Sequence, residues 1–379
     1  SEHHRRAYKL LSGAPQTLSK QGIWTFGAPS VLGLYLRTGC SLRQTVEDMQ
    51  ECMPPYYLLS GWHGAGAAEL TEAEALLLQG RIDEMDMPLQ KAYYQAEKHG
   101  QECITICCDF LEMQRDLFRG VYSSKAEAYS RHQWQLQPWQ QSMLLNTADM
   151  CAGFYYALLG KPEYIPSWLT DENGQQPSVL YPARPCRNYI SAQCLLAQGQ
   201  YTELLVRWSD WEQECRPYSN FLCLLYLQVQ RAAAFAGRGD VTSCRASLKQ
   251  ALAMAAADKL VLPLAQNIAL LRPYLEQEAQ GEFSAMAAAA LHLGQQLEAG
   301  RGQIMSVRFA EAGLQELTEQ ELQIAQLAAA RHTNREIAQR LSLSEGTIKQ
   351  YLNKIFAKLQ IDAAAKNKRH QLERFFPNS

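Results

Sequence analysis

The sequence of 379 residues lacks any run of 18 apolar residues and any recognisable signal peptide. Because a membrane-crossing helix needs about 20 predominantly apolar residues, this composition supports neither a membrane span nor export. Alternating runs rich in β-branched residues, which are typical of half-buried strands, are also missing. The sequence therefore predicts an all-α protein with a cytoplasmic location.

Cysteine is absent from the last 135 residues, although 11 cysteines are scattered from Cys40 to Cys244. An odd number without framework spacing fits a reducing compartment better than a disulfide scaffold. Cys103, Cys107 and Cys108 lie within one or two helical turns and could begin a metal site. No His or fourth Cys stands near them at ligand spacing, so buried thiols are favoured and neither a metal nor another cofactor is expected.

Catalytic signatures are missing as well. The sequence contains no G-x-x-x-x-G-K-[ST] motif and no Ser–His–Asp or paired-carboxylate arrangement above background, so we expect no enzyme activity. The net charge of −2 excludes a uniform polycation. Between Ser344 and Arg369, however, six basic residues face two acidic ones. A basic block on a short terminal domain predicts a polyanionic partner, and a solvated helix face is the alternative.

Glycine recurs with a period of about 40 residues through the first 300, a self-similarity typical of solenoids built from helical hairpins. We expect each glycine to adopt the left-handed conformation where the first helix of a hairpin ends, and a small residue seven positions earlier lets two helices cross closely. The small residues are Ala73, Gly153, Ala192 and Ala232. The glycines in phase are Gly39, Gly80, Gly120, Gly160, Gly199 and Gly239, with Gly281 at the next interval.

This spacing resembles a stretched tetratricopeptide pattern, and stacked hairpins of that kind form a concave surface lined by the first helix of each pair. Aromatic and amide side chains on it would suit sugars, small ligands or peptides, whereas the alternative is that they pack the repeats together. Trp24, in "WTFGAPS", either lines the effector cavity or plugs the N-terminal end of the superhelix. The other residues predicted for an effector or partner groove are Phe110, Gln114, Phe154, Tyr189, Gln193, Tyr226 and Gln230.

The C-terminal region contains signals for three short helices. Thr318 with Glu321, and Thr333 with Glu336, have the spacing of capping boxes. Three residues, "SLS", separate the second helix from the third, and Ser344 is placed to cap the third.

The third of these helices sorts apolar and polar residues onto opposite sides. Its apolar stripe is Ile348, Leu352, Ile355, Phe356 and Leu359. A short helix, a tight turn and a helix with a basic and amide face predict a helix-turn-helix whose second helix fits a major groove. By residue chemistry alone, a protein-binding bundle is the alternative. The predicted base contacts are Lys349, Gln350 and Asn353, and the predicted phosphate contacts are Thr333, Asn334, Ser344, Thr347, Lys354 and Lys358.

The segment "LTEQELQIAQLAAARHTNREIAQRLSLSEGTIKQYLNKIFAKLQI" resembles the LuxR-type DNA-binding domain nearly from end to end. In that family the residues matching Lys349, Gln350 and Asn353 tend to face bases. The resemblance implies a fourth helix from about Asp362 to Arg374 that helps to pair two copies, and hence a dimer or higher oligomer on DNA. Two departures are Tyr351 in place of the usual His and "DAAAKNKR" before helix four.

The front part resembles the MalT-like branch of LuxR regulators, and "WTFGAPSVL" is similar to a segment of its bacterial members. The resemblance implies a helical superhelix that senses an inducer and, upstream of it, an ATPase module. Because the sequence starts with Ser and lacks a phosphate-binding loop, we expect a fragment, a trimmed chain or a member without that module.

Together these observations predict a tetratricopeptide-like α-solenoid over residues 1–297, a linker over 298–313 and a small four-helix helix-turn-helix domain over 314–379. The predicted function is that of a transcriptional regulator whose partners are double-stranded promoter DNA and an inducer or regulatory protein on the concave surface. A protein-interaction scaffold with a vestigial DNA-binding domain is the alternative.

Overall fold

The structure is a computed structural model that describes residues 23–132, 141–171, 177, 179–309, 317–359, 372 and 376. Within these ranges the regular elements are helices, and the β contact recorded there is a single bridge between Arg37 and Asn220. The all-α prediction is confirmed.

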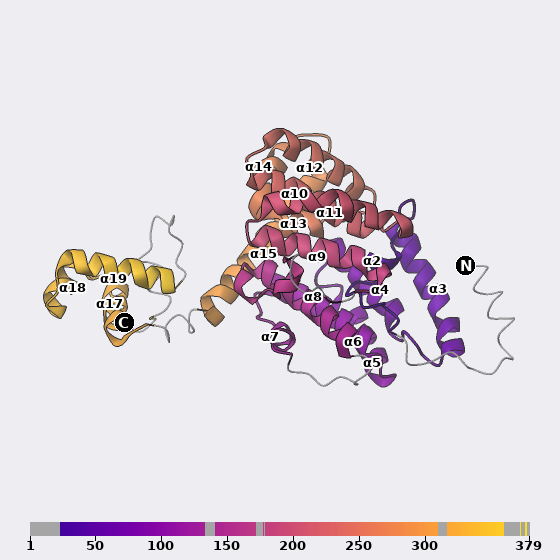
Figure 1. Cartoon of the computed structure of the whole chain (residues 1–379), viewed down its shortest axis with the longest axis horizontal. Coiled ribbons are helices and arrows are strands. Elements are labelled where there is room, and N and C mark those ends of the chain that lie inside the picture. The colour runs from indigo at the N-terminus through magenta and orange to yellow at the C-terminus, as the bar shows by residue number, and fades with distance from the viewer. Residues whose placement is uncertain are drawn as a thin grey trace. The chain divides into compact units, whose positions relative to one another are not determined.

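The helices follow one another along the chain, and the longest connection between described helices of the first 300 residues runs from α8 to α9 (Figure 1). Their bounds are α2 Leu32–Tyr35, α3 Leu42–Ser60, α4 Ala67–Leu78, α5 Asp86–Lys98, α6 Glu102–Arg119, α7 Ser124–Ser130, α8 Gln141–Leu159, α9 Arg184–Ala197, α10 Tyr201–Cys215, α11 Phe221–Gly237, α12 Val241–Ala256, α13 Leu262–Gln266, α14 Ile268–Glu278, α15 Ser284–Ile304, α17 Glu319–Ala329, α18 Asn334–Leu341 and α19 Glu345–Lys358. Single 3-10 turns cover Pro162–Tyr164, Ser167–Leu169, Tyr181–Ala183 and Arg216–Tyr218, and Met305–Phe309 form a π-helical turn.

The chain divides into two compact units. The first comprises Ser1–Arg119 and Ser123–Glu298, and the second comprises Gly120–Tyr122 and Ala299–Ser379. We call the first the helical-repeat unit. Residues 298–309 of the predicted linker are helical, because α15 and the π turn run through them. Residues 310–313 lie outside the described ranges.

The periodic glycines mark the ends of helices, as their spacing predicts. All six have positive φ, between 68° at Gly120 and 87° at Gly39, whereas Gly281 does not. Five of them lie one or two residues after the ends of α4, α6, α8, α9 and α11. The small residue seven positions earlier is buried in each of the four cases named above. At Gly153 an added Cβ would lie 2.4 Å from Leu169 Cδ1, so close packing explains the small residue there.

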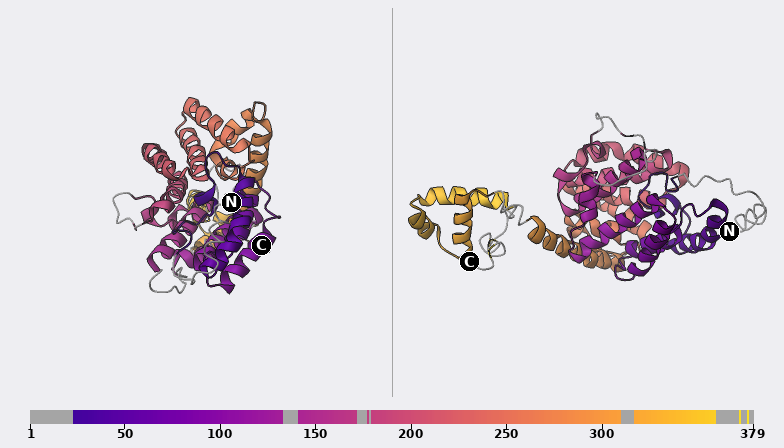
Figure 2. Two further views of the ribbon diagram at one scale, coloured as in Figure 1. Left: turned by 90° about the vertical axis from the view of Figure 1, so that its right-hand side faces the viewer. Right: turned by 90° about the horizontal axis from the view of Figure 1, so that it is seen from below.

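The helices that precede these glycines pack against one another in sequence and close into a ring. Helix α4 packs on α6, α6 on α8, α8 on α9, α9 on α11 and α11 on α13, and α13 returns to contact α4. Figure 1 shows the stack from α6 through α8 and α9 to α11, and Figure 2 shows the unit from two further sides. At the closure, Gln266 of α13 donates a hydrogen bond of 2.9 Å to Gln114 of α6. This arrangement of helix pairs is compatible with the predicted solenoid.

Residues 23–38, here called the inner segment, run through the middle of this ring. The segment contains the four-residue helix α2, which packs against α4, α9 and α11. Most of its residues from Trp24 to Leu36 are buried, and Ala28, Val31, Leu32 and Leu36 have no exposed surface. An apolar segment buried by helices from five successive pairs contributes to the core of the whole unit.

A buried carboxylate on α4 holds the inner segment. Glu74 is 5% exposed and accepts hydrogen bonds from the Val31 and Leu32 amides, at 3.1 and 2.9 Å, and from the Ser30 hydroxyl. Burial raises the pKa of Glu74 from 4.5 to about 7, although these hydrogen bonds act in the opposite direction.

This pKa predicts a pH-dependent stability. Between about pH 4.5 and 7 the folded chain binds more protons at Glu74 than the unfolded chain does. The stabilisation is therefore complete below pH 4.5 and is lost as pH rises through 7, by about 3 kcal/mol. Urea midpoints measured from pH 5 to 8 should show this slope, and Glu74→Gln should flatten it. Glu72→Gln, on the same helix, is the control, and equal slopes in all three proteins would contradict the assignment.

Candidate nucleic-acid interface and effector face

Helices α17, α18 and α19 enclose a small apolar core in the C-terminal domain. Its buried side chains include Ile324 and Ala328 from α17, Ile337 from α18, and Ile348 and Leu352 from α19. Leu327, Leu341, Leu343 and Phe356 are partly buried against it. Leu372, from the predicted fourth helix, belongs to the same core. Most of residues 362–374, including "DAAAKNKR", lies outside the described ranges.

Side-chain caps set where each helix begins. Both predicted capping boxes are present, Thr318 with Glu321 and Thr333 with Glu336, and the Ser344 hydroxyl accepts from the Thr347 amide at 3.0 Å. The Thr333 amide donates to Glu336 and holds the pKa of that carboxyl below its ordinary value. Each cap typically contributes about 1 kcal/mol, so short helices are stable in a small domain.

The turn between α18 and α19 is as short as the sequence predicts. Ser342 ends α18 with φ 54°, and the Leu343 amide donates to the Ala338 carbonyl at 2.9 Å. Leu343 packs against the domain core and fixes the angle between the two helices. The geometry is that of a helix-turn-helix.

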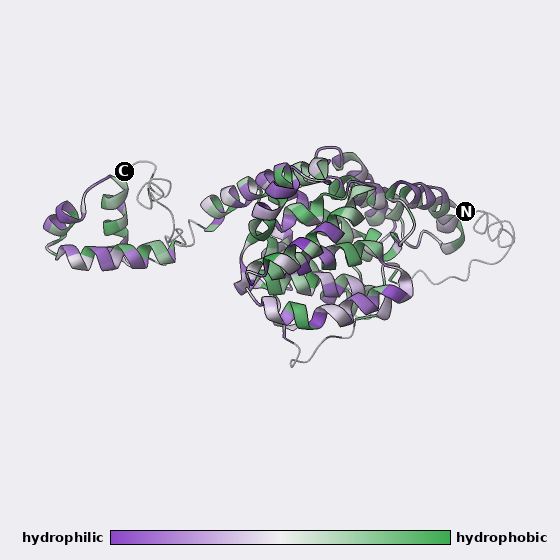
Figure 3. Ribbon diagram, turned by 90° about the horizontal axis from the view of Figure 1, so that it is seen from above, coloured by the Kyte–Doolittle hydropathy of each residue, from purple (hydrophilic) through white to green (hydrophobic). Residues whose placement is uncertain are grey.

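Helix α19 presents a continuous polar face. Lys349, Gln350, Asn353 and Lys354 are exposed, whereas Ile348, Leu352 and Ile355 on the other side are buried. Hydrophilic and hydrophobic turns alternate along this helix in Figure 3. Gln350, Asn353 and Lys354 follow Lys349 by one, four and five positions, so the four exposed residues lie on one side of the helix. Two ammonium groups beside two amides can donate to phosphates and to the acceptor edges of bases.

Four further predicted DNA contacts lie at the N-terminal ends of α18 and α19, and they differ in how exposed they are. Thr333 and Ser344, the caps of α18 and α19, are exposed, and Asn334 is half-buried. Thr347 is half-buried, and its hydroxyl lies 2.8 Å from that of Ser344. The N-terminal ends of both helices thus carry hydroxyls that already serve as caps.

Lys358 has a different partner from the predicted phosphate. Its ammonium lies 2.6 Å from Oε2 of Glu321, whose side chain is 6% exposed. This contact holds the pKa of Glu321 below its ordinary value, and the Thr318 amide adds to the effect. Glu321 is buried where α17 packs against α19, and Lys358, one turn beyond the exposed face of α19, neutralises it. Tyr351, the departure from the family pattern, donates to Gln320 on α17 at 3.0 Å.

A comparison of family models decides what this domain is. Residues 315–366 match the family described as bacterial regulatory proteins, luxR family. The C-terminal domain is a LuxR-family helix-turn-helix. The match covers this domain and supports DNA binding in transcription regulation as its role. No curated protein and no solved structure shows significant similarity to the chain. The MalT-like and tetratricopeptide-like assignments of the front part stay predictions.

The residues predicted for an effector groove come together, but they are buried. Phe154 of α8 makes edge contacts with Phe110, Tyr189 and Tyr226 from α6, α9 and α11, at centroid distances of 5.5, 5.8 and 6.3 Å. Tyr189 and Tyr226 stack at 4.6 Å. Each of these rings is at most 4% exposed. The aromatic side chains therefore join neighbouring repeats in the way the alternative interpretation expected.

The predicted amides are buried in the same region. Gln230 donates to the Tyr189 carbonyl at 2.8 Å and to Gln193 at 3.0 Å, and Gln114 accepts from Gln266. Trp24 is 8% exposed and packs on Tyr35. A cavity of only about 10 Å³ remains among Ser30, Glu74, the aromatic rings and α13. The concave face is filled, because the inner segment lies on it.

Sequence reasoning missed the residues that hold the inner segment. Glu74, Asn220 and Cys223 all contact its backbone. One signal could have found Glu74, since a carboxylate directly after the small residue Ala73 sits on an otherwise apolar helix face. No comparable signal marks Asn220, whose partner lies 187 positions earlier.

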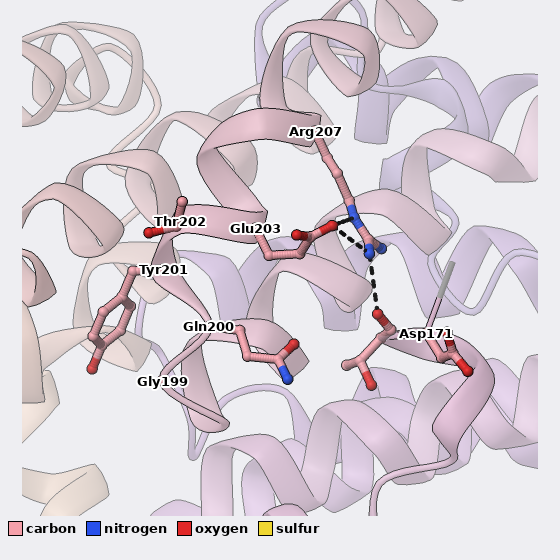
Figure 4. Close-up of a pocket in the computed structure, with 8 residues that line it drawn as sticks. Asp171, Gly199, Gln200, Tyr201, Thr202, Glu203 and Arg207 are labelled. Carbon is pink, nitrogen blue, oxygen red and sulfur yellow. Dashed lines mark hydrogen bonds and ion pairs between the residues drawn. The ribbon is translucent and has the colours of Figure 1, made fainter. Parts of the chain in front are cut away.

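Other groups in the described residues have structural partners. A hollow of about 570 Å³ beside the start of α10 is drawn in Figure 4, where Arg207 pairs with Glu203 and with the Thr170 carbonyl. Burial raises the pKa values of the Cys103, Cys107 and Cys108 thiols and favours their neutral form. No group of three or more His, Cys, Asp or Glu side chains suited to a metal occurs in the described ranges. Among the helices described, none is long and apolar enough to cross a membrane.

Substitution of two lysines of α19 should have different effects, because Lys354 is a predicted phosphate contact and Lys358 pairs with Glu321. Lys354→Met should weaken DNA binding and reduce the slope of log K against log salt by about 1, because one phosphate contact is lost. Lys358→Met should instead lower the stability of the domain by about 1–2 kcal/mol, since Glu321 loses its partner. Salt titrations and amide hydrogen exchange across α17–α19 measure the two effects. A reduced salt slope without loss of protection in Lys358→Met would contradict the structural role.

Proposed function

We propose that this chain binds specific promoter sequences through α19 and that its helical-repeat unit senses an inducer or a regulatory protein. The observation that carries the first part is the exposed face of Lys349, Gln350, Asn353 and Lys354 on the second helix of a helix-turn-helix. In such motifs the second helix enters the major groove with its N-terminal half toward base edges. Lys349, Gln350 and Asn353 lie in the first nine positions of α19.

The proposed base and phosphate contacts follow from the chemistry of the exposed side chains. Lys349 donates to guanine O6 and N7, and Gln350 and Asn353 pair with adenine. Lys354 and the free amides at the starts of α18 and α19 contact phosphates, which set the register of the protein on the duplex. The protein binds as a dimer or higher oligomer, in the cytoplasm, as the family resemblance implies.

The sensing role is supported by the separation of the two units and by the chemistry inside the first. The helical-repeat unit has its own core, and aromatic rings with amide groups gather at its centre. In the free chain these side chains pack against one another, so we propose that an effector reaches them only when it replaces the inner segment that covers them. Helix α15 leads from this unit into the segment before the helix-turn-helix, so a change in the first unit has a covalent route to the second.

Selection from a pool of random duplexes tests DNA reading. The wild-type chain should enrich one motif with two half-sites, and Lys349→Ala/Asn353→Ala should lose it, at about 1–3 kcal/mol for each base contact removed. Gln323→Ala/Gln326→Ala, which removes two exposed amides from α17, is the control and should retain the motif.

Binding without any motif, or enrichment that the double variant retains, would favour the alternative of a protein-interaction scaffold. A selection with residues 314–379 alone separates that alternative from inhibition by the helical-repeat unit.

Coupling between the units predicts a change in protease sensitivity. Val307, within the predicted linker, is 64% exposed and offers an accessible cleavage region. The rate of cleavage within residues 298–313 should change when the selected duplex is added, because binding shifts the population of linker conformations. Cleavage at the same rate with and without the duplex would argue that the two units act independently.

A further inference from the structure

The inner segment is held mainly through its backbone, by side chains that come from distant helices. The Thr147 hydroxyl of α8 donates to the Gly27 carbonyl at 2.8 Å, and the Cys107 thiol of α6 donates to the Ala28 carbonyl at 3.4 Å. Asn220, which precedes α11, donates from Nδ2 to the Gly33 carbonyl at 2.8 Å. Backbone recognition by single side chains on successive helices is how a groove holds a bound peptide, rather than how adjacent helices pack.

Glu74 completes this recognition in the middle of the segment. Its carboxylate accepts the Val31 and Leu32 amides at the start of α2, which no earlier residue of the segment caps. A carboxylate at that position satisfies amides that would otherwise be buried without a partner. At the other end, the Phe221 amide donates to the Leu36 carbonyl at 3.0 Å, and the Thr38 amide donates to Ser219.

At two positions of the inner segment, neighbouring side chains leave no room for a residue larger than glycine. A Cβ at Gly33 would lie 2.7 Å from the Cys186 sulfur, and one at Gly27 would lie 2.9 Å from Met143 Cγ. Ala28, between them in sequence, is fully buried. We call the surface of the surrounding helices that contacts the inner segment the inner face. At the positions of Gly27 and Gly33 this face leaves room only for small side chains, so it selects for a sequence pattern and not merely for apolar residues.

The segment leaves the ring through an exposed connection. Residues 37–41 are exposed, and an added Cβ at Gly39 would meet nothing within 4 Å. Helix α3 then begins at Leu42 with its own cap, Ser41. The chain between Thr38 and Ser41 thus works as a tether whose cutting removes no buried contact.

In the described part of the chain, buried acceptors without a hydrogen-bond donor occur at Asn220, which contacts the inner segment, and elsewhere in the core of the unit. Among the described residues, Oε1 of Gln230 and Oε1 of Gln266 are buried acceptors without a hydrogen-bond donor, and so is Oδ1 of Asn220. Gln230 and Gln266 are 0% and 5% exposed. Each buried unsatisfied acceptor costs about 1–3 kcal/mol, a cost that an occupant with suitable donors would remove.

We infer that the inner face of the helical-repeat unit is a peptide-binding groove. Residues 25–36 of the same chain are its present ligand, and a partner polypeptide with the same small-residue pattern binds there by displacing them. The partner presents about a dozen residues with a glycine or alanine at the positions of Gly27, Ala28 and Gly33, and backbone carbonyls toward Thr147 and Asn220. This inference rests on the proposed sensing role and narrows its partner to a peptide.

Cleavage of the tether tests the inference on the full chain. A site for a specific protease is inserted after Gly39, and the cut chain is mixed with a fluorescent peptide of residues 23–38. The cut chain should keep its helical circular dichroism and bind the peptide saturably, whereas the uncut chain should bind it at least about a hundredfold more weakly because the tethered segment competes at high effective concentration.

Three variants establish the site. A peptide carrying Gly33→Phe should not bind, because its side chain would meet the Cys186 sulfur of α9. Glu74→Ala in the chain should weaken peptide binding by about tenfold or more, because the Val31 and Leu32 amides of the peptide would be buried without an acceptor. Glu72→Ala, on the same helix but outside the groove, should leave binding unchanged.

Several results would overturn the inference. Loss of helical structure on cleavage, or retention of the cut segment without exchange in large peptide excess, would make the segment a permanent part of the core. Equal binding of the Gly33→Phe peptide would show that no defined groove is involved. Because binding is measured without DNA, failure of the duplex selection would overturn the proposed regulator and leave this result standing, whereas failure of exchange alone would overturn only the peptide groove.

Discussion

The helical-repeat unit depends on satisfying the backbone of a segment that is buried inside a ring of helices. A helix or a sheet satisfies its own amides and carbonyls, but an irregular segment cannot, and each unpaired group buried away from water is costly. Here the partners come from Glu74, Cys107, Thr147 and Asn220. These four residues belong to different parts of the ring, so the segment can be buried only when the ring has closed around it.

The same requirement accounts for the buried acid on α4. A carboxylate in an apolar surrounding is unfavourable by itself, and its raised pKa expresses that cost. Its two oxygens accept two amides and a hydroxyl that would otherwise be buried without an acceptor. The C-terminal domain uses the opposite arrangement. Glu321 and Glu336 also accept backbone amides, but each has a cationic or polar neighbour that lowers its pKa, so their caps remain charged and strong at neutral pH.

The two units also differ in where their specificity resides. The DNA-binding face is made of exposed side chains on one rigid helix, and rigidity is supplied by caps at both ends of a short turn. The proposed effector face is interior, and its side chains already contact the inner segment. A regulator built in this way would respond to a ligand by exchanging one buried partner for another, so the response depends on the difference between two binding free energies and not on the affinity of either occupant.

The sequence by itself determined the all-α class, the capping boxes, the apolar stripe of α19 and the left-handed glycines at Gly80 and Gly199, because each depends on residues within about one or two helical turns. It also placed Phe110, Phe154, Tyr189 and Tyr226 at helical spacing before the repeat glycines, by 10, 6, 10 and 13 residues, and so on related helix faces. Only the tertiary structure decided that they are covered. Trp24 and Gly33 reach positions beside residues that follow them by 40 to 190 places, and no local periodicity records such contacts. It likewise decided that Lys358 neutralises Glu321, because the burial of that carboxylate comes from the packing of α17 against α19 and not from the order of residues in either helix.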